Sequence, residues 1–276
     1  MSGAETGVRA GIGRVLIIAG SDSGGGAGIQ ADIKTVIALG GYAATAITAL
    51  TAQDTLGVHG VMAVPAAFVV HQARVVLDDI GADSIKIGMV NQIDVIEALA
   101  VLLAPSALTI PVVLDPVMVA KGGSPLLDPA AIGCLTSCLI PRAAVITPNL
   151  PEAALLTHRT IETVDDMHRA ADTLLALGSQ AVLLKGGHLS GDIVTDLLVT
   201  AAGTVQFESP RFLSVHTHGT GCTLASAVAT GLAQGLSLRD AVDRGRRYVQ
   251  EAIRTAPGLG HGHGPLNHGH TVTSFR

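Results

Sequence analysis

The chain of 276 residues is poor in aromatic and in charged side chains. It contains two Tyr, four Phe and no Trp, and only 14% of its residues are charged, against about 25% in an average domain. Aromatic side chains form the stacking platforms of single-stranded nucleic-acid sites, so their scarcity argues against such a site. The 17 Lys and Arg residues are outnumbered by 22 Asp and Glu and form no cluster. A nucleic-acid groove or a contact with an anionic membrane is therefore not expected.

The sequence also lacks a disulfide framework and a clear membrane segment. Its three cysteines, Cys134, Cys138 and Cys222, are an odd set, which fits a reducing cytoplasm best. The charge-free stretch over 35–53 is interrupted by Gly40 and Gly41, whereas a membrane span needs about 20 mostly apolar residues. The first 13 residues contain no signal-peptide core. We expect a cytoplasmic protein.

Short apolar runs alternate with segments of helical periodicity. Residues 15–19 read VLIIA and stop at a glycine-rich turn, after which apolar residues recur at helical spacing from Ile29 to Ile37. Such alternation is typical of a parallel sheet covered on both faces. We expect further strands over 43–52, 84–87, 111–114, 145–147 and 181–185, and a hairpin over 193–200 and 205–209. Helices are expected near 69–80, 93–103, 164–175, 222–233 and 238–255.

No strong linker divides the chain, so we expect one α/β domain over residues 14–256. Residues 1–13 and 257–276 are expected to be flexible or peripheral. The alternative is two domains joined near Gly122 and Gly123. The last segment is rich in Gly and His, and a mobile tail is favoured over a metal site built from its four histidines, His261, His263, His268 and His270.

Polar residues and glycines follow nearly every expected strand. Ligands of open α/β sheets bind beyond the carboxyl ends of the strands, so these residues are expected to share one rim. An amide, carboxylates, a lysine and bare backbone N–H groups suit a phosphorylated ligand with a metal ion. The alternative is that strand ends simply favour polar turn residues. The residues concerned include Gly20, Asp22, Gln53, Met89, Asp115, Asn149, Glu152 and Lys185.

The sharpest local motif is HGTGCT over 218–223, which opens an Ala-rich helix. Its glycines let backbone N–H groups converge at a helix N-terminus, which makes an anion site. A thiol there, Cys222, is expected to have a lowered pKa; the alternative is a glycine turn with a small buried cysteine. The P-loop and the Gly-x-Ser-x-Gly motif are not found, and the first glycine loop does not match the dinucleotide fingerprint.

Seven ordered motifs resemble the hydroxymethylpyrimidine/phosphomethylpyrimidine kinases of thiamin biosynthesis. They are AGSDSGGGAGIQADIKT (19–35), TALTAQDT (48–55), KIGM (86–89), VVLDPVMVAKGG (112–123), ITPNLPEA (146–153), LLKGGHL (183–189) and THGTGCTLASA (217–227). The resemblance implies a ribokinase-like three-layer αβα sandwich with a mostly parallel central sheet. It implies ATP-dependent phosphorylation of 4-amino-5-hydroxymethyl-2-methylpyrimidine, and then of its monophosphate to the pyrophosphate. It also implies a homodimer.

The resemblance implies a role for individual residues at the substrate end. Gln53 would hydrogen-bond the aminopyrimidine, because an amide can donate to a ring nitrogen and accept from an amino group. The other residues implied to line this pocket are Asp32, Gly20, Ala27 and Met89. The alternatives are a solvated carboxylate on the first helix for Asp32, which the motif match disfavours, and simple packing for Met89.

The resemblance also assigns the phosphate end. Lys185, Asn149 and Thr220 would contact ATP, and Lys185 would meet its phosphates as a point charge. Gly219, Gly221 and Cys222 would form an anion hole, and Cys222 as general base is a hypothesis, since phosphoryl transfer needs little help from a base. The residues implied to position hydrated Mg²⁺ are Asn149 and Glu152, with Asp115 assisting through water.

Two alternative functions remain. A pyridoxal kinase on the same scaffold is compatible with Cys222, although the pair of Gln53 and Met89 favours the aminopyrimidine. A pyrimidine-binding protein without transfer activity is the second. The sequence departs from the family pattern at His216 and over 122–124, and Lys121 in that loop is either a phosphate ligand or a solvated side chain.

Overall fold

The computed structural model describes residues 12–104, 110–118 and 129–272. Lys121, residues 122–124 and residues 1–11 of the expected N-terminal segment lie outside this part of the chain. Within it, nine strands form one sheet in the order β3-β2-β1-β4-β5-β6-β7-β8-β9. The parallel strands are β1 (Arg14–Asp22), β2 (Tyr42–Gln53), β4 (Ser84–Ile87), β5 (Val112–Leu114), β6 (Val145–Ile146) and β7 (Ala181–Leu184). The antiparallel strands are β3 (Val58–Ala63), β8 (Ile193–Thr200) and β9 (Gly203–Pro210).

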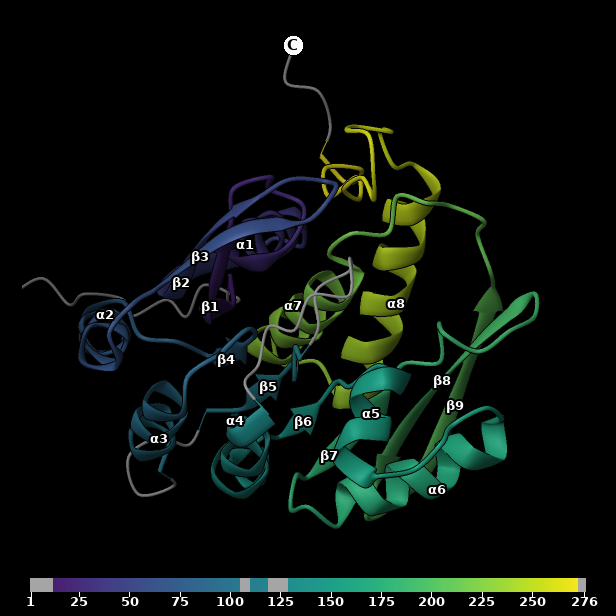
Figure 1. Ribbon diagram of the computed structural model, residues 1–276, viewed down its shortest axis with the longest axis horizontal. Helices are drawn as coiled ribbons and strands as arrows, with labels where there is room; N and C mark the ends of the chain where they lie inside the picture. The colour runs from purple at the N-terminus through teal and green to yellow at the C-terminus, as the bar shows by residue number, and fades with distance from the viewer. Residues whose placement is uncertain (1–11, 105–109, 119–128, 273–276) are drawn as a thin grey trace, which may run out of the picture.

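Helices cover both faces of the sheet (Figure 1). Along β1, Leu16 and Ile18 pack into one core, whereas Val15 and Ile17 pack into the other. The first core is closed by α2 (Ala66–Asp79), α3 (Ile93–Leu102), α4 (Pro129–Cys134), α5 (Leu150–Thr157) and α6 (Val164–Leu175). The second is closed by α1 (Gly28–Ala38), α7 (Thr220–Ala233) and α8 (Leu238–Arg254). The expected three-layer sandwich with a mostly parallel sheet is confirmed.

Strand β3 is a feature that the sequence analysis missed. It pairs with the carboxyl-terminal half of β2 to make a hairpin, and the chain turns at Asp54, whose Oδ1 accepts the N–H groups of Leu56 and Gly57. Four of its six residues are exposed. A mostly exposed strand needs no alternating apolar pattern, so the pattern search had nothing to detect.

The described part of the C-terminal segment, residues 257–272, packs against the domain. Leu266 and His268 are 3% and 4% exposed. The ring nitrogen Nε2 of His268 lies 2.9 Å from Thr223 Oγ1, and the Tyr248 hydroxyl donates to the His268 carbonyl oxygen. Burial lowers the pKa of His268 to about 4, so the ring is neutral at physiological pH. In the described part of the chain, no group of three His, Cys, Asp or Glu residues is placed to hold a metal ion.

The same segment ties two loops together. The N–H of His263 donates to the Thr55 carbonyl oxygen in the β2–β3 turn, at 2.9 Å. The N–H of His218, before α7, donates to the Gly264 carbonyl oxygen at 3.2 Å. The segment thereby links the β2–β3 turn to the loop before α7. None of the helices among the described residues has the length and apolar character needed to cross a membrane.

Candidate active site

A cavity of about 650 Å³ lies along the carboxyl ends of the parallel strands and the N-terminus of α7. It brings together residues that are far apart in the sequence, as the rim argument predicts. Gln53 and Cys222 line this one cavity. All but one of the site residues expected from the sequence line it: Gly20, Ala27, Gln53, Met89, Asp115, Asn149, Glu152, Lys185, Gly219, Thr220, Gly221 and Cys222.

Asp32 is the exception, and its placement as a pocket residue is corrected. It is fully buried beneath the cavity on α1, where Oδ2 accepts from Lys86 Nζ at 2.8 Å and Oδ1 accepts from the Ser226 hydroxyl at 2.7 Å. Lys86 itself lines the cavity. Burial opposes its charge, but the carboxylate of Asp32 outweighs burial and raises the pKa of Lys86. Asp32 therefore supports a buried cation, which the sequence analysis did not identify.

Lys185 and Asp115 form a second ion pair, at the ends of β7 and β5. Lys185 Nζ lies 3.0 Å from Asp115 Oδ1, and Thr147 Oγ1 donates to the same oxygen. Burial tends to lower the pKa of Lys185, but the charges of Asp115 and Glu152 outweigh it, so the net pKa is raised. Lys185 is a permanent cation at the edge of the cavity, 13% exposed.

Asn149 and Glu152 are held by the start of α5. The Asn149 side chain accepts from the Glu152 N–H, and the Glu152 carboxylate accepts from the Asn149 N–H, a reciprocal capping box. Burial raises the pKa of Glu152 to about 7, opposed by the charge of Lys185. A nearby cation would favour its carboxylate form. Two carboxylates and an amide oxygen suit a hydrated Mg²⁺, which keeps several waters and few protein ligands.

Two glycine loops meet at the N-termini of α1 and α7. Gly219 has φ of +83°, and a Cβ there would overlap the carbonyl oxygen of Gly26. Gly28 has φ of +54°, and a Cβ there would overlap the carbonyl oxygen of Gly20. Both positions require glycine, because other residues rarely adopt this backbone conformation and the space is filled. Residues at both helix N-termini line the cavity, where helix N–H groups and positive potential favour an anion.

Cys222 lies at this junction, and its chemistry differs from the expectation. Burial raises the pKa of the Cys222 thiol to about 12, although the charge of Lys86 acts in the opposite direction. The helix N-terminus predicted a lowered pKa, but the burial of the thiol outweighs this effect. The thiol is therefore neutral at physiological pH.

Cys222 should consequently react slowly with alkylating agents. Below its pKa the thiolate fraction rises about tenfold with each pH unit, so the rate of labelling by iodoacetamide should keep rising from about pH 7 to about pH 10, since the thiolate is the nucleophile. Peptide mass spectrometry would separate Cys222 from Cys134 and Cys138. A rate that levels off below about pH 9 would contradict the raised pKa.

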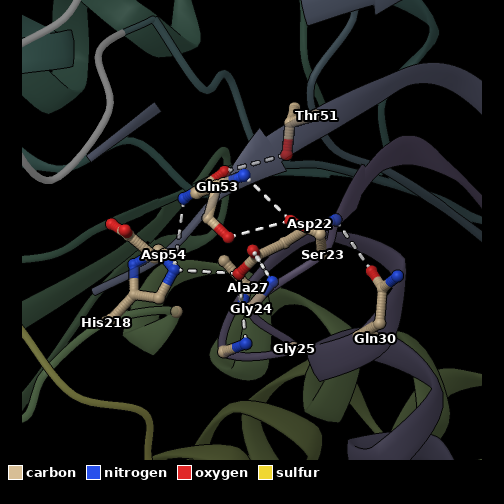
Figure 2. Close-up of polar contacts among 12 residues, drawn as sticks. Asp22, Ser23, Gly24, Gly25, Ala27, Gln30, Thr51, Gln53, Asp54 and His218 are labelled. Carbon is tan, nitrogen blue, oxygen red and sulfur yellow. Dashed lines mark hydrogen bonds and ion pairs between the residues drawn. The ribbon is translucent and has the colours of Figure 1, made fainter. Parts of the chain in front are cut away.

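Asp22 and His218 are cavity residues that received no role from the sequence. Figure 2 shows His218, from the loop before α7, facing Asp22 at the end of β1 and Gln53 at the end of β2. His218 Nε2 lies 2.9 Å from Asp22 Oδ2 and 3.3 Å from Gln53 Nε2. Both residues stand within motifs noted above, but nothing in the sequence indicates that they meet across 196 positions.

A further buried pair supports the loop that carries Lys185. Asp196 on β8 accepts from the Gly186 N–H at 2.9 Å and from Arg246 Nε at 2.7 Å. The Arg246 guanidinium also lies 5.2 Å from the centre of the Phe207 ring. The pair of Asp196 and Arg246 fixes the backbone next to Lys185. The sequence gives little indication of this pair, because α8 carries many charged residues.

The chain is similar to curated proteins over most of its length. The family model described as phosphomethylpyrimidine kinase matches residues 22–267. The thiamine biosynthesis bifunctional protein ThiED of Geobacter sulfurreducens is 52% identical over 256 residues, which cover 93% of this chain and 52% of that protein, so the chain spans about half its length. The hydroxymethylpyrimidine/phosphomethylpyrimidine kinases of Streptomyces coelicolor and Bacillus subtilis are 48% and 45% identical, over 92% of this chain and 94% of each relative.

Solved structures of kinases superpose on most of this chain. An ADP complex of Bacillus subtilis pyridoxal kinase superposes with a TM-score of 0.86 at 36% identity, covering 93% of this chain and 97% of that chain. Phosphomethylpyrimidine kinase from Clostridium difficile superposes with a TM-score of 0.77 at 42% identity, covering 87% and 99%. The ribokinase-like fold is thereby confirmed. With a family model matching nearly the whole described chain, this protein belongs to the phosphomethylpyrimidine kinase family.

Proposed function

We propose that the protein transfers the terminal phosphoryl group of ATP to 4-amino-5-hydroxymethyl-2-methylpyrimidine, and then to the monophosphate, giving the pyrophosphate for thiamin biosynthesis. The observation that carries this proposal is the layout of one cavity. Its lining combines a hydrogen-bonding amide, Gln53, with the cation Lys185, the carboxylates of Asp115 and Glu152, and the glycine turn of α7.

The substrate end suits a small flat ring. A Cβ on Gly20 would overlap the Cε of Met89, so the Met89 side chain lies directly against the Gly20 backbone and forms a smooth apolar wall. Gln53 supplies a donor and an acceptor on one edge. Ala27, at the start of α1, completes this wall with a small side chain.

The phosphate end suits a nucleotide triphosphate. A Cβ on Gly221 would lie 3.0 Å from Lys185 Nζ, so the ammonium group faces the turn that holds Gly219 and Gly221. Lys185, Asn149 and Thr220 would contact ATP, and the N–H groups of the turn would stabilise charge that develops during transfer. Asp115, Asn149 and Glu152 would hold Mg²⁺ through water, where the ion neutralises phosphate charge.

We assign Cys222 to this anion hole through its backbone N–H. A neutral thiol cannot accept the proton of the hydroxymethyl group, and the raised pKa keeps the thiol neutral. Because the transition state of phosphoryl transfer is loose, the alcohol can lose its proton late without a strong base. The raised pKa therefore argues against Cys222 as the general base.

The test is mass spectrometry of the products formed from the pyrimidine alcohol and Mg-ATP. We expect the monophosphate first and the diphosphate later, with a matching consumption of ATP. No ATP consumption would identify a pyrimidine-binding protein without transfer activity. Pyridoxal kinase is the second candidate, favoured by the superposition with pyridoxal kinases. A larger kcat/KM for pyridoxal than for the pyrimidine would establish it instead.

We further propose that the protein is a cytoplasmic homodimer. Leu50, Val61 and Met62, on the β2–β3 hairpin, are 42%, 49% and 61% exposed, an apolar group that a second copy would cover. The three free cysteines fit a reducing compartment. Neither a nucleic acid nor a membrane is proposed as a partner.

A further inference from the structure

The carboxylate of Asp22 is surrounded by hydrogen-bond donors. Its Oδ1 accepts from the Gly24 N–H at 2.8 Å, and its Oδ2 accepts from the N–H groups of Gly26 and Ala27 at 3.1 and 2.8 Å. The residue is 2% exposed. Burial acts to raise the pKa of Asp22, but the hydrogen bonds from His218 and Ala27 outweigh burial and the net pKa is lowered. At neutral pH this group is therefore a carboxylate that can only accept.

Because the Asp22 carboxylate can only accept hydrogen bonds, it determines which ring nitrogen of His218 carries hydrogen. Nε2 of the ring lies 2.9 Å from Asp22 Oδ2. If Nε2 carried a lone pair, two acceptors would face each other across a buried contact. Nε2 must therefore carry hydrogen, in the neutral or in the charged ring.

The proton on His218 in turn determines the orientation of the Gln53 amide. One end of this amide lies 3.3 Å from His218 Nε2, and the other lies 3.2 Å from Thr51 Oγ1. The Thr51 hydroxyl also lies 2.9 Å from the Ser21 carbonyl oxygen, and donating there leaves its lone pairs for Gln53. Rotating the side-chain amide by half a turn from the orientation drawn in Figure 2 exchanges the positions of its oxygen and its nitrogen. With the oxygen toward His218, the single Nε2–H donates to Asp22 Oδ2 and is shared with the Gln53 oxygen at the longer distance, while the Gln53 N–H donates to Thr51. In the other orientation the Gln53 N–H groups would face a ring nitrogen that has no lone pair.

We propose that Asp22 and His218 fix the Gln53 amide in this orientation and thereby select the edge of the pyrimidine that the cavity accepts. This inference rests on the proposed function. His218 and Thr51 occupy the flanks of the amide, so its remaining lone pair and its remaining N–H face the ligand. The lone pair can accept from an exocyclic amino group, and the N–H can donate to the ring nitrogen beside it. This is the edge that a 4-aminopyrimidine presents. A 4-oxo ring offers a carbonyl oxygen beside a ring N–H, which is the reverse order.

The ring cannot correct this mismatch by turning over, because its hydroxymethyl group has to face the phosphates. The amide cannot turn either, since rotation would bring its N–H groups against the Nε2–H of His218. Asp22 and His218 are thus positioning residues that act on the substrate through Gln53.

The test compares kcat/KM for the 4-amino alcohol and for its 4-oxo analogue. A site with fixed polar groups rejects a mismatched ligand strongly, so the protein should prefer the 4-amino alcohol by at least about 100-fold. His218→Leu frees the amide, and the preference should fall by about tenfold or more. His218→Gln restores an N–H at a similar reach, and should recover much of the preference.

His59→Asn is the matched control. His59 Nε2 pairs with Asp54 Oδ2 at 2.9 Å on the same hairpin, but both side chains are more than half exposed and outside the cavity. The preference should be unchanged in this variant. An equal loss of kcat/KM for both substrates in His218→Leu would show a packing role only and would overturn the proposal.

NMR of the ¹⁵N-labelled protein provides a readout that does not depend on turnover. We expect a protonated Nε2 on His218 and cross-peaks from the Gln53 amide hydrogens to Thr51. An unprotonated Nε2, or cross-peaks to His218 instead, would overturn the proposal even if His218→Leu fails to fold. If the protein phosphorylates neither pyrimidine, the proposed function fails, and the NMR result still decides the orientation of the amide.

Discussion

Replacing Lys185 by methionine is expected to lower kcat by about 100- to 1,000-fold, the usual effect of removing one group that stabilises transition-state charge. Methionine keeps an unbranched apolar stem and removes only the ammonium group, which faces the glycine turn of α7 and pairs with Asp115. The KM for the pyrimidine should change little, because the pyrimidine is proposed to bind through Gln53 and not through Lys185. Steady-state kinetics with the pyrimidine alcohol and Mg-ATP measures both values.

The stability of this variant has to be measured alongside its activity. Asp115 is 1% exposed, and a buried charge left without its partner costs about 3–5 kcal/mol. The double variant Lys185→Met with Asp115→Asn removes both charges. It should recover thermal stability and remain inactive. A Lys185→Met enzyme that folds normally and keeps most of its kcat would contradict the role of Lys185 at the phosphates.

Gly219→Ala is expected to have an even larger effect, a loss of at least about 1,000-fold in kcat, because it displaces more than one N–H donor of the turn. The new methyl group would overlap the Gly26 carbonyl oxygen, and the residue would be held at a φ of +83°. The strain should also reduce stability by about 1–3 kcal/mol. Turnover measurements and thermal unfolding followed by circular dichroism would separate the two effects.

Gly133→Ala is the matched substitution for this experiment. Gly133 lies in α4, and a Cβ there would meet no atom within 4 Å. Alanine favours a helix over glycine by up to about 1 kcal/mol, so this variant should be as active as the parent and slightly more stable. If Gly219→Ala behaves like Gly133→Ala, the turn before α7 does not form the anion hole.

The parallel part of the sheet was predictable because burial on both faces leaves a direct trace in the sequence. VLIIA and AVLL are continuous apolar runs, and their residues alternate between the two cores. The rim residues were predictable for the same reason, since the end of each apolar run marks where a polar group emerges. Strand β3 left no such trace, because it is mostly exposed and contains Gly60.

The incorrect predictions at the site concern how deeply the side chains are buried and which residues they pair with. The sequence analysis did not identify Lys86 as a buried cation, and its partner Asp32 lies 54 positions away, so the pair could not be recognised from the pattern. The position of Cys222 at a helix N-terminus was predicted correctly. The effect on its pKa was not, because burial in the fold outweighs the helix N-terminus. The orientation of Gln53 likewise depends on contacts that only the fold brings together.

The docking of the C-terminal segment has a consequence for how the protein matures. A chain emerges from the ribosome N-terminus first, so β1, β2 and Gln53 are available long before residues 263 and 264. These late residues hold Thr55 and His218, the latter being the side chain that faces Gln53. The sheet can form during synthesis, but the pyrimidine end takes its final shape only after residues 263 and 264 have emerged. A nascent chain stalled before that point should therefore fold without being able to select its substrate.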